Sequence, residues 1–292
     1  MRRPMLSAEE VRFALASIAE MRPGDDFAPQ STSWTYHCSF LDTDLAYRRE
    51  AWALGTRLFT RFVEESFHDY RIVQSNIYVK PPRTGQFGLH QNWPATADLN
   101  ETTLTLWCPL VDVDEGNGVV QFLPGSHKLL PHVQGPQSKS FFEDLIPDLR
   151  PHLEWEPLPA GEGMIFDDSL LHGSEPNRSA TPRIAIQLIL VPAEATPAFF
   201  HKVDDETFEI IRADWDFWLR HQHRDLLSRQ PEWEHLAFVK SQNRAVSLAE
   251  FETLLAAGAE IRRRGLSLER VPHAHTGPLG GKGFLRRLLG RA

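Results

Sequence analysis

Cysteine is nearly absent from this sequence, which has only Cys38 and Cys108 in 292 residues. Two cysteines are too few for a disulfide framework or a cysteine-rich zinc site, and we expect both to pack as reduced thiols. Long apolar runs are also missing, so no membrane span is expected. The start of the sequence carries Glu9, Glu10 and Arg12 where a signal peptide needs an apolar stretch. We therefore expect a cytoplasmic protein.

Basic charge is in deficit as well. The formal net charge is -8, which removes the electrostatic argument for binding nucleic acid or an anionic membrane. A small molecule is the partner that this composition favours. With 41% hydrophobic and 10% aromatic residues, the chain has enough apolar material to bury the core of one large domain.

The rhythm of apolar residues divides this domain, 1–292, into three regions. Residues 1–70 are expected to be mainly helical, because apolar residues recur every three or four positions in 7–21 and 44–67. Residues 71–195 contain short apolar runs such as RIVQSNIYV and PRIAIQLILVP, broken by Gly and Pro turns, which is typical of a β-sandwich, barrel or jelly roll. Residues 196–292 are expected to form a helical extension, with helices in 204–229 and 247–265, and a basic tail that frays or touches a membrane or partner.

Two of the thirteen histidines stand out. His90 and His172 each follow a strand-like segment inside the β region and sit beside turn residues, whereas the others lie in polar or helical contexts. Arg183 follows His172 by eleven residues and begins an apolar strand. A cation in such a strand is costly to bury alone, so Arg183 needs an anionic partner.

Three motifs in order resemble the phytanoyl-CoA dioxygenase family, which includes ectoine hydroxylase. They are YVKPPRTGQFGLHQNW, LWCPLVDVDEGNGVVQFLPGSHK and GEGMIFDDSLLHGSEPNRSATPR. The resemblance covers about residues 76–192. It implies a mainly β fold, a double-stranded β-helix of the jelly-roll or cupin-like type with flanking α-helices, because the strand pattern alone does not select this barrel. It also implies Fe(II), 2-oxoglutarate and O2 chemistry that hydroxylates an unactivated C–H bond of a small metabolite and releases succinate and CO2.

The same resemblance assigns residues to roles. His90, Asn92 and His172 would bind the iron, and Arg183 with Ser174 would hold the far carboxylate of 2-oxoglutarate. Trp107, Asn76 and Lys80 would be further positions of the cosubstrate site. His127 in LPGSHK is expected to have a structural role.

Asn92 departs from the family pattern, which has an aspartate in the His-x-Asp motif. An amide offers a neutral oxygen, so the iron would be held less tightly. Asn92 can still ligate, or a nearby carboxylate can substitute for it, or the position can serve a halogenase or a protein without catalytic activity. The carboxylates considered as substitutes are Asp98, Asp167 and Asp168.

Two rivals stay open beside the dioxygenase. A cupin-like isomerase or hydrolase with zinc or manganese would use the same barrel, although it would not need Arg183. A binding module without catalysis would release no succinate. The substrate is not identified by the sequence. Trp34, Trp52 and Tyr36 are expected to pack in the core, and the alternative is that they line a pocket for an apolar or ring-bearing molecule.

Overall fold

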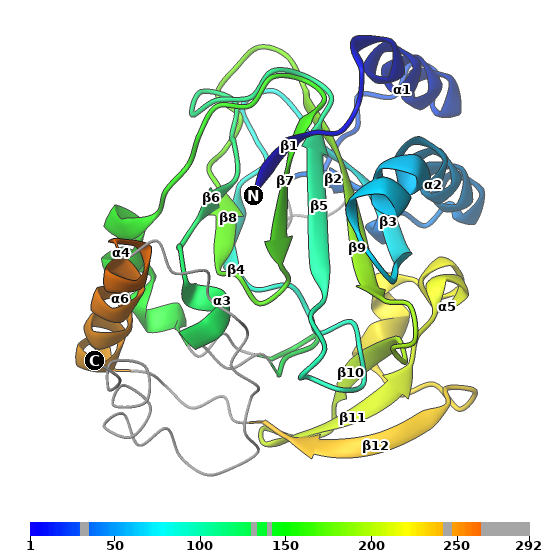
Figure 1. Ribbon diagram of the computed structural model, residues 1–292. Coiled ribbons are helices and arrows are strands. Elements are labelled where there is room, and N and C mark those ends of the chain that lie inside the picture. Colours follow the sequence, from blue (N-terminus) through cyan, green and yellow to red (C-terminus); the bar gives the residue numbers. More distant parts are fainter. Residues whose placement is uncertain (30–34, 130–132, 139–141, 242–246, 264–292) are drawn as a thin grey trace.

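Two antiparallel sheets make up the centre of the molecule (Figure 1). The computed structural model describes residues 1–29, 35–129, 133–138, 142–241 and 247–263. The larger sheet has six strands in the order β1 (Arg2–Pro4), β7 (Glu162–Asp167), β5 (Leu104–Pro109), β9 (Arg183–Pro192), β3 (Tyr70–Lys80) and β2 (His37–Cys38). The smaller sheet has three, in the order β4 (Phe87–His90), β8 (His172–Ser174) and β6 (Gln121–Phe122).

The path of the chain identifies the barrel. From β3 to β9 successive strands alternate between the two sheets, so that every odd-numbered strand joins the larger sheet and every even-numbered strand joins the smaller one. All pairings are antiparallel. Such a double-stranded β-helix is the jelly-roll fold that the family resemblance predicts, and the prediction is confirmed.

Strand β9 shows why these sequences form this sheet. Its alternate residues Ile186, Leu188 and Leu190 are fully buried in the hydrophobic core that the larger sheet shares with the N-terminal helices. The residues between them point into the barrel, where Gln187 lines a cavity and Ala185 packs among the inner apolar residues. The period of two places polar side chains on the inner face only.

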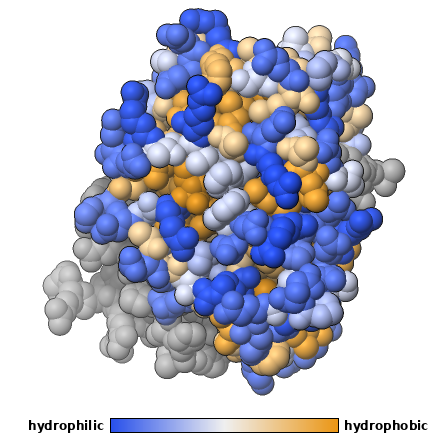
Figure 2. All heavy atoms as spheres, turned by 90° about the vertical axis from the view of Figure 1, so that its right-hand side faces the viewer, coloured by the Kyte–Doolittle hydropathy of each residue, from blue (hydrophilic) through white to orange (hydrophobic). Residues whose placement is uncertain are grey.

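Two helices cover the outer face of the larger sheet. α1 (Ala8–Met21) and α2 (Leu45–Ser66) begin after the N-caps Ser7 and Asp44, and both helices were predicted. Ser7 forms a capping box with Glu10, which fixes the start of α1. The helices contribute Ile18 and Phe59 to the same core as β9. The face of the molecule that carries them is mostly hydrophilic, with hydrophobic areas between the polar side chains (Figure 2).

Shorter helical segments connect the strands. They are η1 (Ser39–Leu41), α3 (Ser126–Leu129), η2 (Glu143–Leu145), α4 (Ile146–Leu149) and η3 (Arg150–His152). Both cysteines are buried and reduced, as expected. The N-terminal region is not purely helical, because β1 and β2 pair with β7 and β3 at the two edges of the larger sheet. No helix in the described part of the chain is long and apolar enough to cross a membrane.

The helix predicted over 204–229 is wrong for its first part. There the chain forms a second three-stranded sheet of β10 (Ala198–Lys202), β11 (Thr207–Arg212) and β12 (His235–Lys240). Phe208 and Ile210 enter one hydrophobic cluster and Ile211 enters another, so β11 is covered on both faces and loses the simple alternation of a half-buried strand. Helix α5 (Trp215–Arg220) and the turn η4 (His223–Leu227) follow within the predicted range.

The helix predicted over 247–265 agrees with α6 (Leu248–Arg263) within the described residues. The basic tail from 277 to 292 lies outside them.

The hydrophobic core between the larger sheet and helices α1 and α2 is expected to dominate stability. Leu106 on β5 is fully buried, and Leu106→Ala should lower the free energy of unfolding by about 2–5 kcal/mol because it leaves a cavity. Phe238→Ala on β12, where the side chain is 63% exposed, is the control and should change stability by less than about 0.5 kcal/mol. Urea unfolding followed by circular dichroism measures both. Equal losses in the two variants would contradict this account of the core.

Candidate active site

Two histidines face each other across the smaller sheet. His90 ends β4 and His172 begins β8, and the antiparallel register pairs them directly. Their ring centroids lie 4.3 Å apart. Each Nδ1 lies 2.8 Å from a backbone carbonyl two residues earlier, that of Gly88 or Leu170. A carbonyl only accepts hydrogen bonds, so Nδ1 carries the proton and Nε2 keeps a lone pair.

Burial keeps both rings neutral. It lowers the pKa of His90 and lowers that of His172 well below the ordinary histidine value, the second effect being enlarged by the neighbouring His90. A neutral imidazole with a free Nε2 is the form that binds a metal. The pair therefore offers two nitrogen ligands that do not need to lose a proton at neutral pH.

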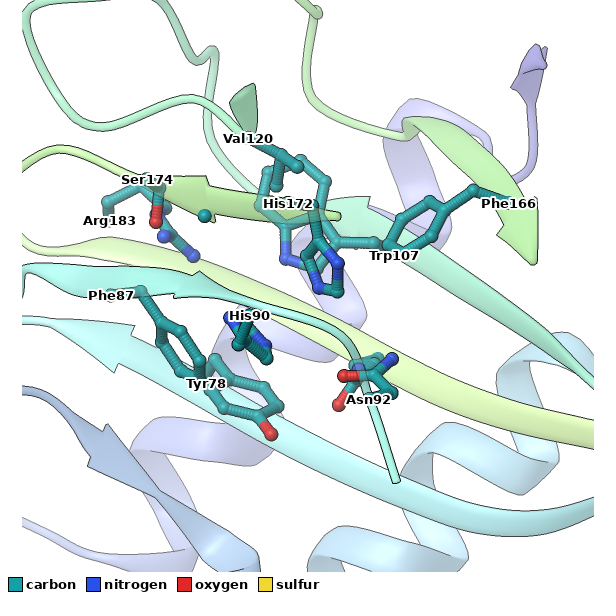
Figure 3. Close-up of a pocket in the computed structure, with 12 residues that line it drawn as sticks. Tyr78, Phe87, His90, Asn92, Trp107, Val120, Phe166, His172, Ser174 and Arg183 are labelled. Atoms are coloured by element: carbon teal, nitrogen blue, oxygen red, sulfur yellow. The ribbon is translucent and has the colours of Figure 1, made fainter. Parts of the chain in front are cut away.

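Asn92 lies beside this pair in the same cavity (Figure 3). Its Nδ2 donates to Thr105 Oγ1 at 2.7 Å and to Asp168 Oδ1 at 3.2 Å. Its backbone N–H donates to the carbonyl of Asp168 at 2.9 Å. Thr105 Oγ1 donates in turn to Asp168 Oδ1 at 2.5 Å. The amide nitrogen is thus committed to a buried network, and the side chain also contacts His90.

The three carboxylates predicted as substitutes lie in different places. Asp98 is exposed and accepts from the Asn100 backbone N–H, and Asp167 accepts from the backbone and hydroxyl of Ser169. Neither lines a cavity that His90 lines. Asp168 is fully buried behind Asn92, and burial raises its pKa to about 6. In the described residues no group of three or more His, Cys, Asp or Glu side chains is placed to bind a metal ion.

Arg183 lies in the same cavity as the histidines. It is 3% exposed, its Nη2 donates to the Gly118 carbonyl at 3.3 Å, and its guanidinium carbon lies 5.2 Å from the centre of the Trp107 ring. In the part of the chain that the structure describes it forms no ion pair, and its Nε has no hydrogen-bond partner. Burial lowers its pKa to about 9. This cation needs an anion, and Ser174 on β8 lines the cavity with it.

The remaining predicted residues lie at different distances from this centre. Asn76 lines an adjoining cavity rather than the one with Arg183. Lys80 pairs with Arg183 across β3 and β9, and its Nζ donates to the carbonyls of Ser174 and Glu175. Lys80 lines neither cavity. The structure therefore brings six of the eight predicted residues into one cavity, namely His90, Asn92, Trp107, His172, Ser174 and Arg183.

Lys80 and His127 lie outside both cavities. Burial and, secondarily, the nearby Arg183 lower the pKa of Lys80 to about 5, so its amine is neutral and holds the end of β8 through hydrogen bonds. Gly118 has φ +83°, and a Cβ there would lie 2.5 Å from the carbonyl oxygen of Glu175. Position 118 therefore admits only glycine. The carbonyl oxygen of His127 lies 3.0 Å from the hydroxyl oxygen of Ser169, whose proton goes to Asp167.

A second cavity of about 240 Å³ adjoins the first and shares His90, Asn92 and Gln187 with it. Aromatic rings and amides line most of it, and the described wall holds no Asp, Glu, Lys or Arg. Its aromatic members are Tyr36, Phe40, Tyr78, Phe87, Trp93 and Trp218. Tyr36 was a predicted pocket residue, whereas Trp52 instead stacks on Trp215 at 5.0 Å and Trp34 lies outside the described residues.

Gln187, Tyr78 and Phe87 line both cavities but were not among the predicted residues. Gln187 had a usable signal, because it is the one amide inside the apolar strand RIAIQLILV. Tyr78 and Phe87 had none, because aromatic residues in strands are equally common in a core.

The profile of the phytanoyl-CoA dioxygenase (PhyH) family matches residues 43–185. Over this segment, which is just under half of the chain, the sequence is similar to the phytanoyl-CoA dioxygenase family. The matched segment contains all the residues that line the histidine cavity except Gln187.

Two curated relatives match the chain. A probable alpha-ketoglutarate-dependent hypophosphite dioxygenase of Stutzerimonas stutzeri is 30% identical over 136 residues, which are 44% of this chain and 47% of the relative. Dioxygenase olcK of Penicillium canescens is 26% identical over 156 residues, 51% of this chain and 46% of the relative. The chain spans about half the length of the curated relatives it matches.

Solved structures of similar shape include SnoK and EctD. The non-heme alpha-ketoglutarate-dependent carbocyclase SnoK from nogalamycin biosynthesis is 23% identical, with a TM-score of 0.49 over 68% of this chain and 81% of that one. EctD from S. alaskensis is 22% identical, with a TM-score of 0.43 over 65% of this chain and 72% of that one.

The buried Asp168 predicts a pH effect on stability. Because its pKa is raised from 3.8 to about 6 in the fold, the folded protein keeps a proton that the unfolded chain releases. This proton contributes up to about 3 kcal/mol to the free energy of unfolding. The contribution is complete below the unfolded pKa of 3.8 and is lost as pH rises through the folded pKa of about 6. Urea unfolding of the wild type and Asp168→Asn across this range should give different pH slopes, with the wild type losing more stability as pH rises. Parallel slopes would show that burial does not raise the pKa of the Asp168 carboxyl.

Proposed function

We propose that this protein is an Fe(II)- and 2-oxoglutarate-dependent dioxygenase that hydroxylates a C–H bond of a small molecule. One observation carries the proposal. The buried guanidinium of Arg183, which forms no ion pair with a described residue, lies in the same cavity as two neutral imidazoles. One cavity therefore offers metal ligands and an anchor for an anion. The family supports it, since the curated relatives are dioxygenases and the first is described as alpha-ketoglutarate-dependent.

The residues present fit an iron ion. His90 and His172 would supply nitrogen from Nε2, and Asn92 would supply its amide oxygen, a set that resembles the two-histidine, one-oxygen site of such enzymes. The set is neutral, whereas the usual one carries a negative charge. The side chain of Asn92 lines the cavity beside the histidines, so the position is filled by an oxygen donor. That favours a hydroxylase over a halogenase, which needs the position vacant for a halide.

The residues also fit 2-oxoglutarate. Arg183 would pair with the far carboxylate, and Ser174 would donate its hydroxyl to the same group. Trp107 closes one side of this space, where its ring lies against the guanidinium. A bidentate carboxylate would satisfy the guanidinium nitrogen that lacks a partner in the described chain.

The bound iron and 2-oxoglutarate supply the oxidising power with O2, and the chain supplies geometry and a dry pocket. Tyr78, Phe87 and Phe166 form apolar walls around the histidines and exclude water. The backbone carbonyls on the two Nδ1 atoms hold both rings in one tautomer and orientation. No side chain needs to act as a general base, which agrees with a cavity whose described lining holds no Asp or Glu.

Anaerobic calorimetry tests the cosubstrate site. The wild type with Fe(II) should bind 2-oxoglutarate, and Arg183→Met should bind it at least about 30-fold more weakly, because removing one partner of a buried charge pair costs about 2 kcal/mol or more. Fe(II) affinity without 2-oxoglutarate should be unchanged in this variant. Arg178→Met replaces an exposed arginine and is the matched control. If the wild type binds neither Fe(II) nor 2-oxoglutarate, the dioxygenase proposal is wrong and a binding module remains.

The second cavity indicates the class of substrate. A charged group entering it would be desolvated without a counter-ion, because its described lining has no side chain with a full charge, and burial lowers the pKa of His223. Aromatic rings such as Tyr36 and Trp218 suit stacking, while Gln74, Asn76 and Gln187 suit hydrogen bonds at the edge of a ring. The cavity reaches His90 and Asn92, where oxidation would occur. The substrate is therefore a neutral, ring-bearing molecule with hydrogen-bonding groups.

Three probes of one shape and different charge test this class. Calorimetry with 1-naphthol, 1-naphthoate and 1-naphthylmethylammonium on the anaerobic protein with Fe(II) and 2-oxoglutarate should show 1-naphthol binding at least about tenfold more tightly than either ion, from the cost of burying an unpaired charge. Equal or tighter binding of either ion, or no binding of 1-naphthol, would exclude a neutral ring-bearing substrate while leaving the dioxygenase proposal intact.

A further inference from the structure

The amide of Asn92 can have only one orientation in its network. Both of its N–H bonds are used, one by Thr105 Oγ1 and one by Asp168 Oδ1. The Thr105 hydroxyl gives its own proton to Asp168, so it can only accept from Asn92. A flipped amide would place its oxygen against a carboxylate oxygen and a hydroxyl oxygen that has no proton to offer. The network therefore keeps the nitrogen on the Asp168 side and leaves the oxygen to the side of His90.

Asp168 is an anion without a counter-ion in the described chain. It is fully buried, it forms no ion pair with a described Lys, Arg or His, and it lines neither cavity that contains the histidines. Its hydrogen-bond donors are neutral groups, the hydroxyls of Thr105 and Thr103 and the amide of Asn92. A buried carboxylate so placed favours a cation nearby. The cavity beside Asn92, which His90 and His172 also line, offers a place for one.

We propose that Asp168 replaces the missing aspartate charge from one position further out, and holds Asn92 as an oxygen ligand through its amide nitrogen. The inference rests on the proposed function, because it assigns a positioning residue to the same metal site. The family pattern has the anion at the ligand itself. Here the ligand is neutral and the anion stands directly behind it, so the net charge of the ligand set and its support is the same.

This arrangement makes position 92 dependent on position 168. In Asn92→Asp the donor facing Asp168 is lost, and two carboxylates oppose each other where the wild type has a 3.2 Å hydrogen bond. Restoring the residue of the family pattern should therefore harm this protein. Adding Asp168→Asn should repair it, because the new amide donates to the new carboxylate and the pair is reversed. The two single changes are expected to be strongly non-additive, as for residues that share one hydrogen-bond network.

The experiment compares the wild type with both single variants and the double variant. Asp167→Asn is the matched control, since Asp167 is the adjacent carboxylate and bonds to Ser169 rather than to Asn92. The first readout is the Tm of the metal-free protein near neutral pH. Asn92→Asp should lower it, Asp168→Asn should not, and the double variant should recover most of the loss. Equal losses in Asn92→Asp and the double variant would overturn the pairing.

The second readout is the affinity for Mn(II) alone, measured by calorimetry without 2-oxoglutarate. Asp168→Asn should weaken it by about 10- to 100-fold, the range typical of residues that support a metal ligand. The double variant should bind at least as tightly as the wild type. An affinity of Asp168→Asn within twofold of Asp167→Asn would overturn the role of Asp168 at the metal. A wild type that binds neither Mn(II) nor 2-oxoglutarate would instead refute the proposed function, and with it the metal role of Asp168, while the Tm comparison still decides the pairing.

Discussion

Strand β9 is the constraint on which the barrel and its site depend. It pairs with β3 on one side and β5 on the other, so it is the strand that joins the two halves of the larger sheet. One face must be apolar, because it forms the core with α1 and α2, and the other carries Arg183 and Gln187 into the barrel. The strict period of a strand satisfies both demands at once. A shift of register by one residue would place Arg183 in the hydrophobic core.

The interior of the barrel holds two charges of opposite sign that no described side chain neutralises. Arg183 lies in the cavity itself, and Asp168 lies behind Asn92. The imidazoles between them are kept neutral by burial. Such an arrangement is costly in an empty protein and is balanced when an anion and a cation bind together. The electrostatics of the fold therefore favour joint binding of a cation and an anion.

Local periodicity was enough to predict much of the fold. α1, α2 and α6 and the long strands β3 and β9 follow from spacing and caps, since each is long enough for its period to show. It failed at β11, where burial on both faces removes the alternation of a strand. It could not reveal β1 and β2, because strands of two or three residues have no period and exist only through their pairing partners.

The sequence by itself determined which chemical groups are available: two histidines, an amide in place of an aspartate, and an arginine that needs an anion. Only the tertiary structure decided how they combine. It paired His90 with His172 across two strands, turned Lys80 toward backbone carbonyls, and set Asp168 behind Asn92 although 76 residues separate them. The reason is geometric. A hydrogen bond between two strands forms only when the donor–acceptor distance is correct to within a few tenths of an ångström. That distance follows from sheet register and packing rather than from any local pattern.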